Sequence, residues 1–322
     1  MNIARIQALV APDMERVDQV IQANLASDVV LINQLSHYII SAGGKRLRPQ
    51  LVMLASRACG YDGDSAPALA AIVEFIHTAT LLHDDVVDAS DLRRGRETAN
   101  NIWGNEAAVL VGDFLYSRAF EMMVSVGSME VMEILSVTTN RIAQGEVMQL
   151  MNVNDPDVTQ NDYLEVIRAK TARLFQAASQ LGAVLAGSEM NLRQGLSDYG
   201  MHLGTAFQIV DDVLDYTQSA DEMGKNLGDD LAEGKPTLPL ILTMQRGTPE
   251  QAALVRQAIE SGGLEDLDAV VAAVKACGAL EESQQVADAE AARAIAALSV
   301  VPPSEYRDAL ESIARFSTAR TS

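Results

Sequence analysis

The sequence has little of what would indicate a secreted, membrane-spanning or nucleic-acid-binding protein. Its 322 residues include two cysteines, Cys59 and Cys277, which provide no disulfide framework and fit a reducing compartment. Lysine and arginine number 24 against 44 aspartate and glutamate, and the net charge of −20 argues against binding to nucleic acid or anionic lipid. No apolar run approaches the roughly 18 residues of a membrane span, and the first residues lack the apolar stretch of a signal peptide. A cytoplasmic protein is therefore expected.

Aromatic residues and prolines are also scarce. With 4% aromatic residues in a chain that is 48% hydrophobic, the core must consist of aliphatic side chains and methionines. No proline lies between Pro67 and Pro156 or between Pro156 and Pro236, and both intervals carry apolar residues at helical spacing. No strand or hairpin signal and no Gly/Ser-rich linker is present, so the sequence predicts a single all-α domain over residues 1–322. Loops or breaks are expected at residues 60–64, 152–157, 224–236 and 302–303.

Two copies of one aspartate motif stand in apolar surroundings. Residues 78–88 and 205–215, which are 127 positions apart (205 − 78), are identical at six of eleven positions, and both end in Asp-Asp-x-x-Asp. On a helix, the first and last aspartates of each copy share a face. Carboxylates among Leu, Ile and Val would be costly without cations between them. The six residues are Asp84, Asp85, Asp88, Asp211, Asp212 and Asp215.

These carboxylates favour a divalent cation. Mg²⁺ prefers a few carboxylates together with substrate phosphates, so two facing triads predict a metal clamp on a diphosphate. One copy alone could also be a solvated helix face or a Ca²⁺ site. His83-Asp84 could belong to an HD-type phosphohydrolase, but that fold needs further histidine ligands, and His37 and His202 have no suitable neighbours. No Ser-His-Asp or Cys-His arrangement is evident, so metals are expected to carry the chemistry.

The few cations gather where they could bind phosphate. Residues 43–49 read Gly-Gly-Lys-Arg-Leu-Arg-Pro, in which the glycines allow close backbone approach and the cations can contact phosphate. A helix start with solvated charges would explain this segment equally well. Arg93 and Arg94 follow Asp88 by five and six residues. Further candidates are Lys170, Thr171, Lys225 and Lys235, and also His77 and Gln208, which share helical faces with Asp84 and Asp211.

These motifs, in this order, resemble the trans-prenyl diphosphate synthases. The resemblance covers about residues 30–300. It rests on Gly-Gly-Lys-Arg-x-Arg-Pro, a first Asp-Asp-x-x-Asp followed by paired arginines, a second one preceded by Phe-Gln, and Gly-Lys-Asn-Leu-Gly-Asp-Asp-Leu at 224–231. It implies an all-helical isoprenoid synthase fold, used as a homodimer, with a deep cavity between the two aspartate helices. The sequence around the motifs is most similar to long-chain bacterial members that supply quinone side chains.

The resemblance also assigns roles to individual residues. The Mg²⁺ ligands, for two or three ions, correspond to Asp84, Asp88 and Asp211, supported by Asp85, Asp212 and Asp215. The allylic diphosphate site corresponds to Arg93, Lys170, Thr171, Gln208, Lys225 and Lys235. The isopentenyl diphosphate site corresponds to Lys45, Arg48, His77 and Arg94. Catalysis is attributed to the six aspartates with Lys170 and Lys225.

The implied reaction is Mg²⁺-assisted ionisation of an allylic diphosphate, condensation with isopentenyl diphosphate and loss of a proton. Farnesyl diphosphate is the expected primer, and repeated addition would give an all-trans product of about C40. The alternatives are products of C20–C35 or C45–C50, a terpene cyclase of related fold, and a non-catalytic regulatory subunit. A cyclase would lack the second aspartate motif and the isopentenyl site, and a regulatory subunit typically loses one motif. No stable membrane insertion is expected, only transient contact during product release.

Small residues before the first motif predict a long product. In short-chain members a position five or four residues before the motif is commonly aromatic and closes the cavity, whereas here Ala79 and Thr80 are small. A helix over residues 68–90 would be about 34 Å long at 1.5 Å per residue, with Ile76 and Val73 lining a tunnel.

A second helix is expected to close this tunnel. Tyr116, Phe120 and Met123 recur at near-helical spacing, and Phe120 or Met123 is expected to form the floor. Each of the three could instead be an ordinary core residue.

Overall fold

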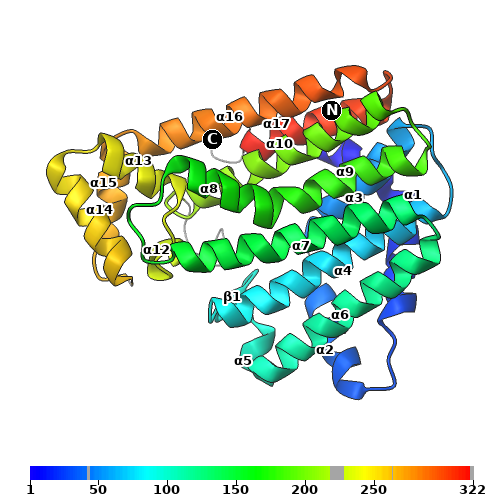
Figure 1. Ribbon diagram of the computed structural model, residues 1–322, viewed down its shortest axis with the longest axis horizontal. Helices are drawn as coiled ribbons and strands as arrows, with labels where there is room; N and C mark the ends of the chain where they lie inside the picture. The colour runs from blue at the N-terminus through cyan, green and yellow to red at the C-terminus, as the bar shows by residue number, and fades with distance from the viewer. Residues whose placement is uncertain (42–43, 218–227, 263, 320–322) are drawn as a thin grey trace. The chain divides into compact units, whose positions relative to one another are not determined.

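The computed structural model describes residues 1–41, 44–217, 228–262 and 264–319 (Figure 1). Helices dominate these residues, and the predicted all-α class is confirmed. The chain divides into two compact units. The first comprises Met1–Thr139, Leu174–Gly200 and Ala297–Ile313, and the second comprises Asn140–Arg173, Met201–Ala296 and Ala314–Ser322. The single domain expected from the sequence stays a prediction.

The first unit consists mainly of long helices (Figure 1). Its complete elements are α1 (Ile3–Leu25), α2 (Val30–Ser41), α3 (Leu47–Ala58), α4 (Ser65–Val87), β1 (Leu92–Arg93), β2 (Arg96–Glu97), α5 (Ala99–Trp103), α6 (Asn105–Val126) and the 3₁₀-helix η2 (Leu298–Val300). Parts of α7 (Met129–Asn152), α9 (Arg173–Leu185), α10 (Met190–Leu214) and α17 (Glu305–Thr318) also belong to it.

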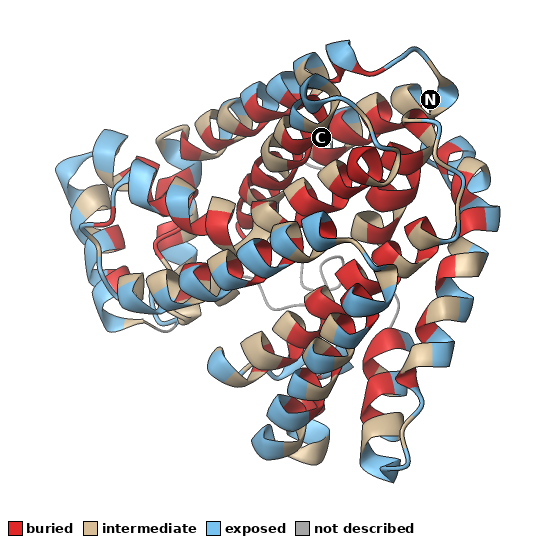
Figure 2. Ribbon diagram, turned by 45° about the vertical axis from the view of Figure 1, so that its right-hand side comes forward, coloured by how far each residue is buried: buried red, intermediate tan, exposed pale blue. Residues whose placement is uncertain are grey.

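Helix α4 forms the centre of this unit's core and packs against α1, α3 and α6. Its apolar residues lie on nearly every face, and a helix that is apolar all round becomes buried. Buried positions are red in Figure 2. Among the described residues, α4 is also the one helix long and apolar enough to cross a membrane, but 67% of that stretch is buried within the protein, as in a core helix. The aspartates at its C-terminal end are therefore carried on a rigid, well-packed element.

A short hairpin follows α4, and the expectation that the chain has no hairpin was wrong. The two strands β1 and β2 pair antiparallel, with Arg93 opposite Arg96. The turn residues Arg94 and Gly95 both have positive φ, 54° and 72°, as a type I′ turn requires. Strands of two residues are too short to show the alternating pattern on which strand prediction depends.

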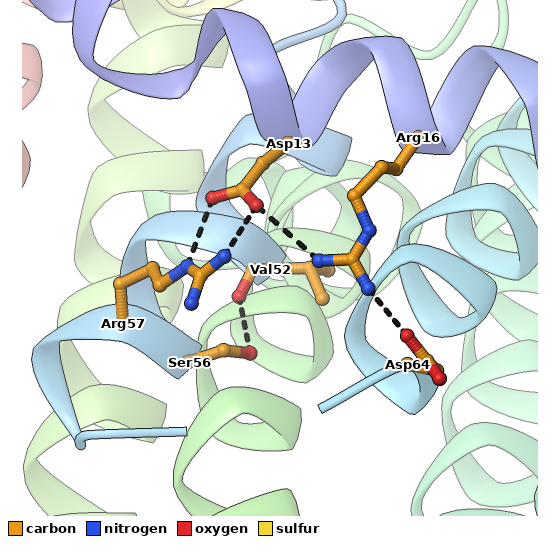
Figure 3. A network of polar contacts seen from close by, with 6 residues as sticks. All are labelled: Asp13, Arg16, Val52, Ser56, Arg57 and Asp64. Atoms are coloured by element: carbon orange, nitrogen blue, oxygen red, sulfur yellow. Dashed lines mark hydrogen bonds and ion pairs between the residues drawn. The ribbon is translucent and has the colours of Figure 1, made fainter. Parts of the chain in front are cut away.

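An ion-pair network joins α1, α3 and the residue before α4 (Figure 3). Arg57 donates two hydrogen bonds to Asp13, from Nε at 2.9 Å and from Nη2 at 2.6 Å. Arg16 lies 3.7 Å from the same carboxylate and donates to Asp64 at 2.6 Å. The Asp13 and Arg57 side chains are 8% and 23% exposed, so this pair is partly shielded from water. It holds the first helix against the third.

The second unit contains the rest of α7, α10 and α17 and several further helices (Figure 1). These are α8 (Gln160–Ile167), the π-helix η1 (Arg168–Ala172), α12 (Asp229–Ala232), α13 (Leu238–Arg246), α14 (Pro249–Ser261), α15 (Leu267–Ala276) and α16 (Ala279–Ala297). Capping boxes begin α8 at Thr159 and α14 at Thr248. The loop expected at 60–64 and the break at 302–303 lie between helices as predicted, and the loop expected at 152–157 begins at Asn152, the last residue of α7. The loop expected at 224–236 was wrong in part, because α12 occupies Asp229–Ala232; residues 224–227 lie outside the described residues.

The core of the second unit fixes the direction of α10. Its buried members include Tyr163, Ile167, Ile209, Val210, Leu214, Leu238, Ile241, Val255 and Val270. Ile209 and Val210 directly precede Asp211, so packing of these two side chains determines which way the second aspartate motif faces.

Candidate active site

The first aspartate motif lies at the C-terminal end of α4, in the first unit. Asp84 and Asp88 are half-buried, whereas Asp85 is buried. Arg93 on β1 donates to Asp85 Oδ1 from both Nε and Nη2, each at 2.7 Å. Burial raises the pKa of Asp85, although the Arg93 charge opposes this shift. The motif therefore presents two accessible carboxylates beside a third that the protein itself holds.

The hairpin turn places Arg94 against Gly44. The backbone of Gly44 has a φ of 143°, which favours glycine at this position. A Cβ atom there would lie 2.6 Å from Arg94 Nη1, so the guanidinium end of Arg94 reaches close to this backbone. Lys45, the next residue, is exposed. Gly43 lies outside the described residues. The Gly-Gly pair of the sequence motif thus provides at least one position where an arginine approaches the backbone.

Arg48 and His77 form a partly buried polar contact in the same unit. Arg48 Nη1 lies 3.0 Å from His77 Nε2. Because a guanidinium can only donate, Nε2 accepts and the neutral ring carries its proton on Nδ1. Burial, followed by the charges of Arg48, Arg94 and Arg93, lowers the pKa of His77 well below 6.5. The arginine also stacks on Phe175, with Cζ 4.4 Å from the ring centroid.

Glu74 is the residue of this cluster that sequence reasoning missed. Burial lowers the pKa of Arg48 to about 10, and the charge of Glu74 opposes that shift. The pKa of Glu74 is itself raised by burial, against the charges of Arg46, Arg48 and Arg94. Its position three residues before His77, on the same helical face, was the available signal. The charge of Glu74 therefore opposes those of Arg48 and Arg94, two of the predicted isopentenyl diphosphate residues.

The second aspartate motif also combines accessible and buried carboxylates, although its third aspartate is buried. Asp211 is exposed, whereas Asp212 and Asp215 are buried. Tyr163 Oη donates to Asp212 Oδ2 at 2.5 Å, and Gln208 Nε2 donates to Asp212 Oδ1 at 2.8 Å. Burial and then the neighbouring Asp230 raise the pKa of Asp212 well above its usual value, although both hydrogen bonds act in the opposite direction.

Asp230 and Tyr163 were not predicted from the sequence. The Asp230 amide donates to Asp215 Oδ2 at 3.3 Å, which draws a fourth carboxylate toward the second motif. The Gly-Asp-Asp-Leu pattern was a signal for Asp230, but a lone tyrosine on another helix gave none. This concentration of negative charge favours a cation.

The π-helix η1 carries Lys170 and Thr171. Lys170 Nζ lies 2.6 Å from Gln149 Oε1 and 2.5 Å from Glu146 Oε2, both on α7. Thr171 Oγ1 donates to Gln208 Oε1 at 2.9 Å. These contacts join η1 to α7 and α10, and a π-helix of this kind is often found at functional sites.

Two predicted lysines remain, Lys235 and Lys225. Lys235 is half-buried and forms an ion pair with Glu233. Lys225 lies outside the described residues.

The residues predicted to set product length lie on α4 and α6, which pack against each other. Val73, Ile76, Ala79 and Met123 are fully buried. Thr80 is half-buried and donates to the His77 carbonyl at 2.8 Å. Tyr116 and Phe120 are half-buried, with ring centroids 5.3 Å apart. Their roles in a tunnel stay predictions.

The aspartate carboxylates of the two motifs suit a hard divalent cation that also binds oxygen atoms of a ligand. Among the residues described, no group of three or more His, Cys, Asp and Glu side chains makes a complete cation site. Asp85 Oδ2 is buried and, within the described part of the chain, lacks a hydrogen-bond partner. Mg²⁺ commonly takes one or two carboxylates and completes its shell with phosphate and water. The carboxylates of each motif fit that preference. His83 contacts Asp113 and the Val109 carbonyl on α6, an arrangement that gives the HD-type alternative no support.

Comparison with known proteins gives one consistent result. The polyprenyl synthetase family model matches residues 29–277. Octaprenyl diphosphate synthase from Escherichia coli (strain K12) is 56% identical over 321 residues, covering 99% of both chains. The all-trans-nonaprenyl-diphosphate synthase (geranyl-diphosphate specific) of Rhodobacter capsulatus is 48% identical over 316 residues, 98% of this chain and 97% of the relative.

A solved structure agrees with these relatives. The polyprenyl synthase from Caulobacter crescentus CB15, complexed with calcium and isoprenyl diphosphate, has a TM-score of 0.96 at 46% identity and covers 100% of this chain and 98% of its own. The resemblance drawn from the motifs is confirmed. The chain belongs to the polyprenyl synthetase family and is a prenyltransferase of the polyprenyl diphosphate synthase type.

Proposed function

We propose that this enzyme extends farnesyl diphosphate with isopentenyl diphosphate to an all-trans product of about C40, for use as a quinone side chain. The observation that carries the chemistry is the repeated arrangement of the two motifs. In each, the first aspartate, Asp84 or Asp211, is accessible, and the second, Asp85 or Asp212, is buried and bonded to protein donors. The identity to octaprenyl diphosphate synthases over nearly the whole chain supports the product class.

Mg²⁺, as two or three ions, would be held by Asp84, Asp88 and Asp211. Bound there, the metal would supply Lewis-acid stabilisation of the leaving diphosphate. Calcium in the Caulobacter complex supports a divalent cation in this family. Asp85, Asp212 and Asp215 orient the motif and keep its negative charge in place.

The cationic residues bind the two diphosphates in this proposal. Arg93, Lys170, Thr171, Gln208, Lys225 and Lys235 hold the allylic diphosphate, and Lys45, Arg48, His77 and Arg94 hold isopentenyl diphosphate. With the leaving group neutralised by fixed donors, the allylic C–O bond breaks, and the isopentenyl double bond attacks the allylic cation. The condensation product then loses a proton from its isopentenyl part to the departing diphosphate, so no side-chain base is needed. The neutral His77 suits a site that binds an anion through the adjacent arginine.

Product length follows from the small residues at 79 and 80. Ala79 is fully buried within α4, and Phe120 and Met123 lie on α6, which packs against it. We place the floor at Phe120 or Met123. The nonaprenyl enzyme at 48% identity shows that product length differs among relatives of this similarity, so C35 and C45 are the nearest alternatives.

We also propose that the enzyme is a cytoplasmic homodimer with transient membrane contact during product release. Exposed apolar side chains on α6 support a self-associating surface: Val109, Leu110 and Val124.

The test is a product assay. Purified protein would be incubated with Mg²⁺, farnesyl diphosphate and labelled isopentenyl diphosphate, and the dephosphorylated products sized by chromatography. Products ending near C40 are expected. Accumulation of C15 or C20 would refute the long-chain proposal, and no incorporation by folded protein would favour the regulatory-subunit alternative. A matched reaction with chelator in place of Mg²⁺ should give no product.

A further inference from the structure

A buried carboxylate of the second unit that belongs to neither aspartate motif connects three helices. Glu290, on α16, is 2% exposed. Its Oε2 lies 2.5 Å from His202 Nδ1 on α10, and its Oε1 accepts from Arg168 Nη2 of η1 at 3.2 Å. Arg293, one turn along α16, donates to Oε1 at 2.7 Å. Both oxygens of the carboxylate are therefore bonded, and two of the three partners belong to other helices.

The composition of α16 makes this residue distinctive. The other buried positions on that helix are small: Ala279, Ser283, Ala287, Ala291 and Ala294. Small apolar residues would pack this face without the cost of removing a charge from water, and a buried ion pair is weak evidence for stability. Glu290 is the one long, charged side chain among the buried positions of α16, and this indicates that it positions the helices to which it is bonded.

The two connections of η1 to α10 lie at its two ends. Arg168 is the first residue of η1 and is held to α10 through Glu290 and His202. Near the other end, Thr171 bonds directly to Gln208, six residues after His202 on the same helix. A π-helical turn is intrinsically less favourable than an α-helical one, so external contacts must maintain it. Lys170 stands between the two connections.

We propose that Glu290 is a positioning residue, which holds η1 against α10 so that Lys170 and Thr171 face the allylic diphosphate. This inference rests on the proposed function, in which those two residues bind that substrate. Glu290 does not touch substrate. It acts through Arg168, and its loss should weaken one substrate selectively, because the proposed isopentenyl diphosphate residues belong to the other unit.

The test compares Glu290→Gln with wild type in steady-state assays that vary farnesyl diphosphate and isopentenyl diphosphate separately. Glutamine keeps the size of the side chain but removes its charge. The KM for farnesyl diphosphate should rise about tenfold, because small displacements of binding groups have large effects. The KM for isopentenyl diphosphate should stay within about twofold. Arg168→Met should show the same selective change, and it provides the test if Glu290→Gln does not fold, since the Arg168 side chain is 41% exposed.

Two controls separate positioning from general stability. Glu282→Gln removes another ion-paired carboxylate of α16, the partner of Arg246, and should leave both KM values unchanged. Arg293→Ala removes the contact that lies within α16 itself and should also have little effect. In the double variant of Arg168 and Glu290, the increase in KM should be no larger than in either single variant, because both remove one connection.

Several results would overturn the inference. Unchanged kinetics in folded Glu290→Gln and Arg168→Met proteins would do so, as would equal rises in both KM values accompanied by a lower Tm. Wild-type protein that transfers no prenyl group would instead refute the proposed function, and the positioning role would fall with it.

Discussion

The hydroxyl of Tyr163 donates a 2.5 Å hydrogen bond to Asp212, and this contact connects α8 with the second aspartate motif. Gln208 donates to the other oxygen of the same carboxylate and accepts from Thr171. Four side chains from three helical segments are thereby linked in one polar chain. The buried aspartate is held from both sides, which leaves the exposed Asp211 to meet a ligand.

Removal of this hydroxyl should impair the use of metal more than the stability of the fold. In Tyr163→Phe, Asp212 loses one of its two side-chain donors. Loss of a hydrogen bond that orients a group at a metal site typically costs about 10-fold to 100-fold in metal affinity or activity. We expect a rise of about tenfold in the Mg²⁺ concentration that gives half-maximal activity.

A second buried tyrosine provides the matched control. Tyr199 Oη donates to the Leu310 carbonyl at 2.8 Å within the first unit, and neither residue belongs to an aspartate motif. Tyr199→Phe also loses a buried hydrogen bond but should keep the wild-type Mg²⁺ dependence. Equal Mg²⁺ dependence in all three proteins would contradict the role assigned to Tyr163.

The pair between Asp13 and Arg57 should contribute strongly to stability (Figure 3). Asp13→Ala leaves a largely shielded guanidinium without its main partner, which we expect to reduce the free energy of unfolding by about 3 kcal/mol. Asp64→Ala, which removes a fully exposed carboxylate from the same network, should cost less than about 0.5 kcal/mol. Urea denaturation measures both, and similar values for the two variants would contradict this ranking.

The lowered pKa of His77 should appear as a pH dependence of stability. In the unfolded chain the imidazole takes up a proton near pH 6.5, whereas in the folded protein it does so only at lower pH. As pH falls through 6.5 the unfolded state therefore binds more protons than the folded state, and stability falls by up to about 1.4 kcal/mol per pH unit.

His77→Gln should remove this contribution. Urea denaturation of both proteins between about pH 5 and pH 8 gives the difference in slope. Parallel curves for wild type and variant would show that His77 does not titrate as its surroundings indicate.

Changes at the two ends of the proposed tunnel should shift product length in opposite directions. Ala79→Tyr places an aromatic ring just before the first motif and should shorten the product by several isoprene units. Met123→Ala opens space at the proposed floor and should lengthen it by one or more units. Chromatography of dephosphorylated products measures both. An unchanged distribution for Met123→Ala would show that this residue does not form the floor.

The sequence predicted the helices and the aspartate motifs because both depend on local spacing. Apolar residues at helical intervals define α4 and α10, and Asp84 and Asp88 share a face through that same periodicity. The basic residues could be predicted because their residue types and order match a family pattern, not because any spacing placed them together.

Features that depend on contacts between distant segments could not be predicted. Tyr163, one of the two side-chain donors to Asp212, lies 49 residues away from it in the sequence. The charge of Glu74 matters because it lies near arginines on other segments of the chain. The hairpin at Arg94 is too short to leave a pattern. The π-helix at Lys170 has α-helical composition, and its extra residue per turn is visible only in the backbone.

Because of that extra residue, the direction of the Lys170 side chain depends on the number of residues in η1 as well as on which residues they are. Deletion of one residue within 168–172 would allow a regular α-helix, and the side chains on one side of the deletion would turn by about 100° about the axis relative to those on the other. Every residue type in the site could be kept, and the lysine would still point elsewhere. Around η1, alignment gaps should therefore be far less tolerated than substitutions.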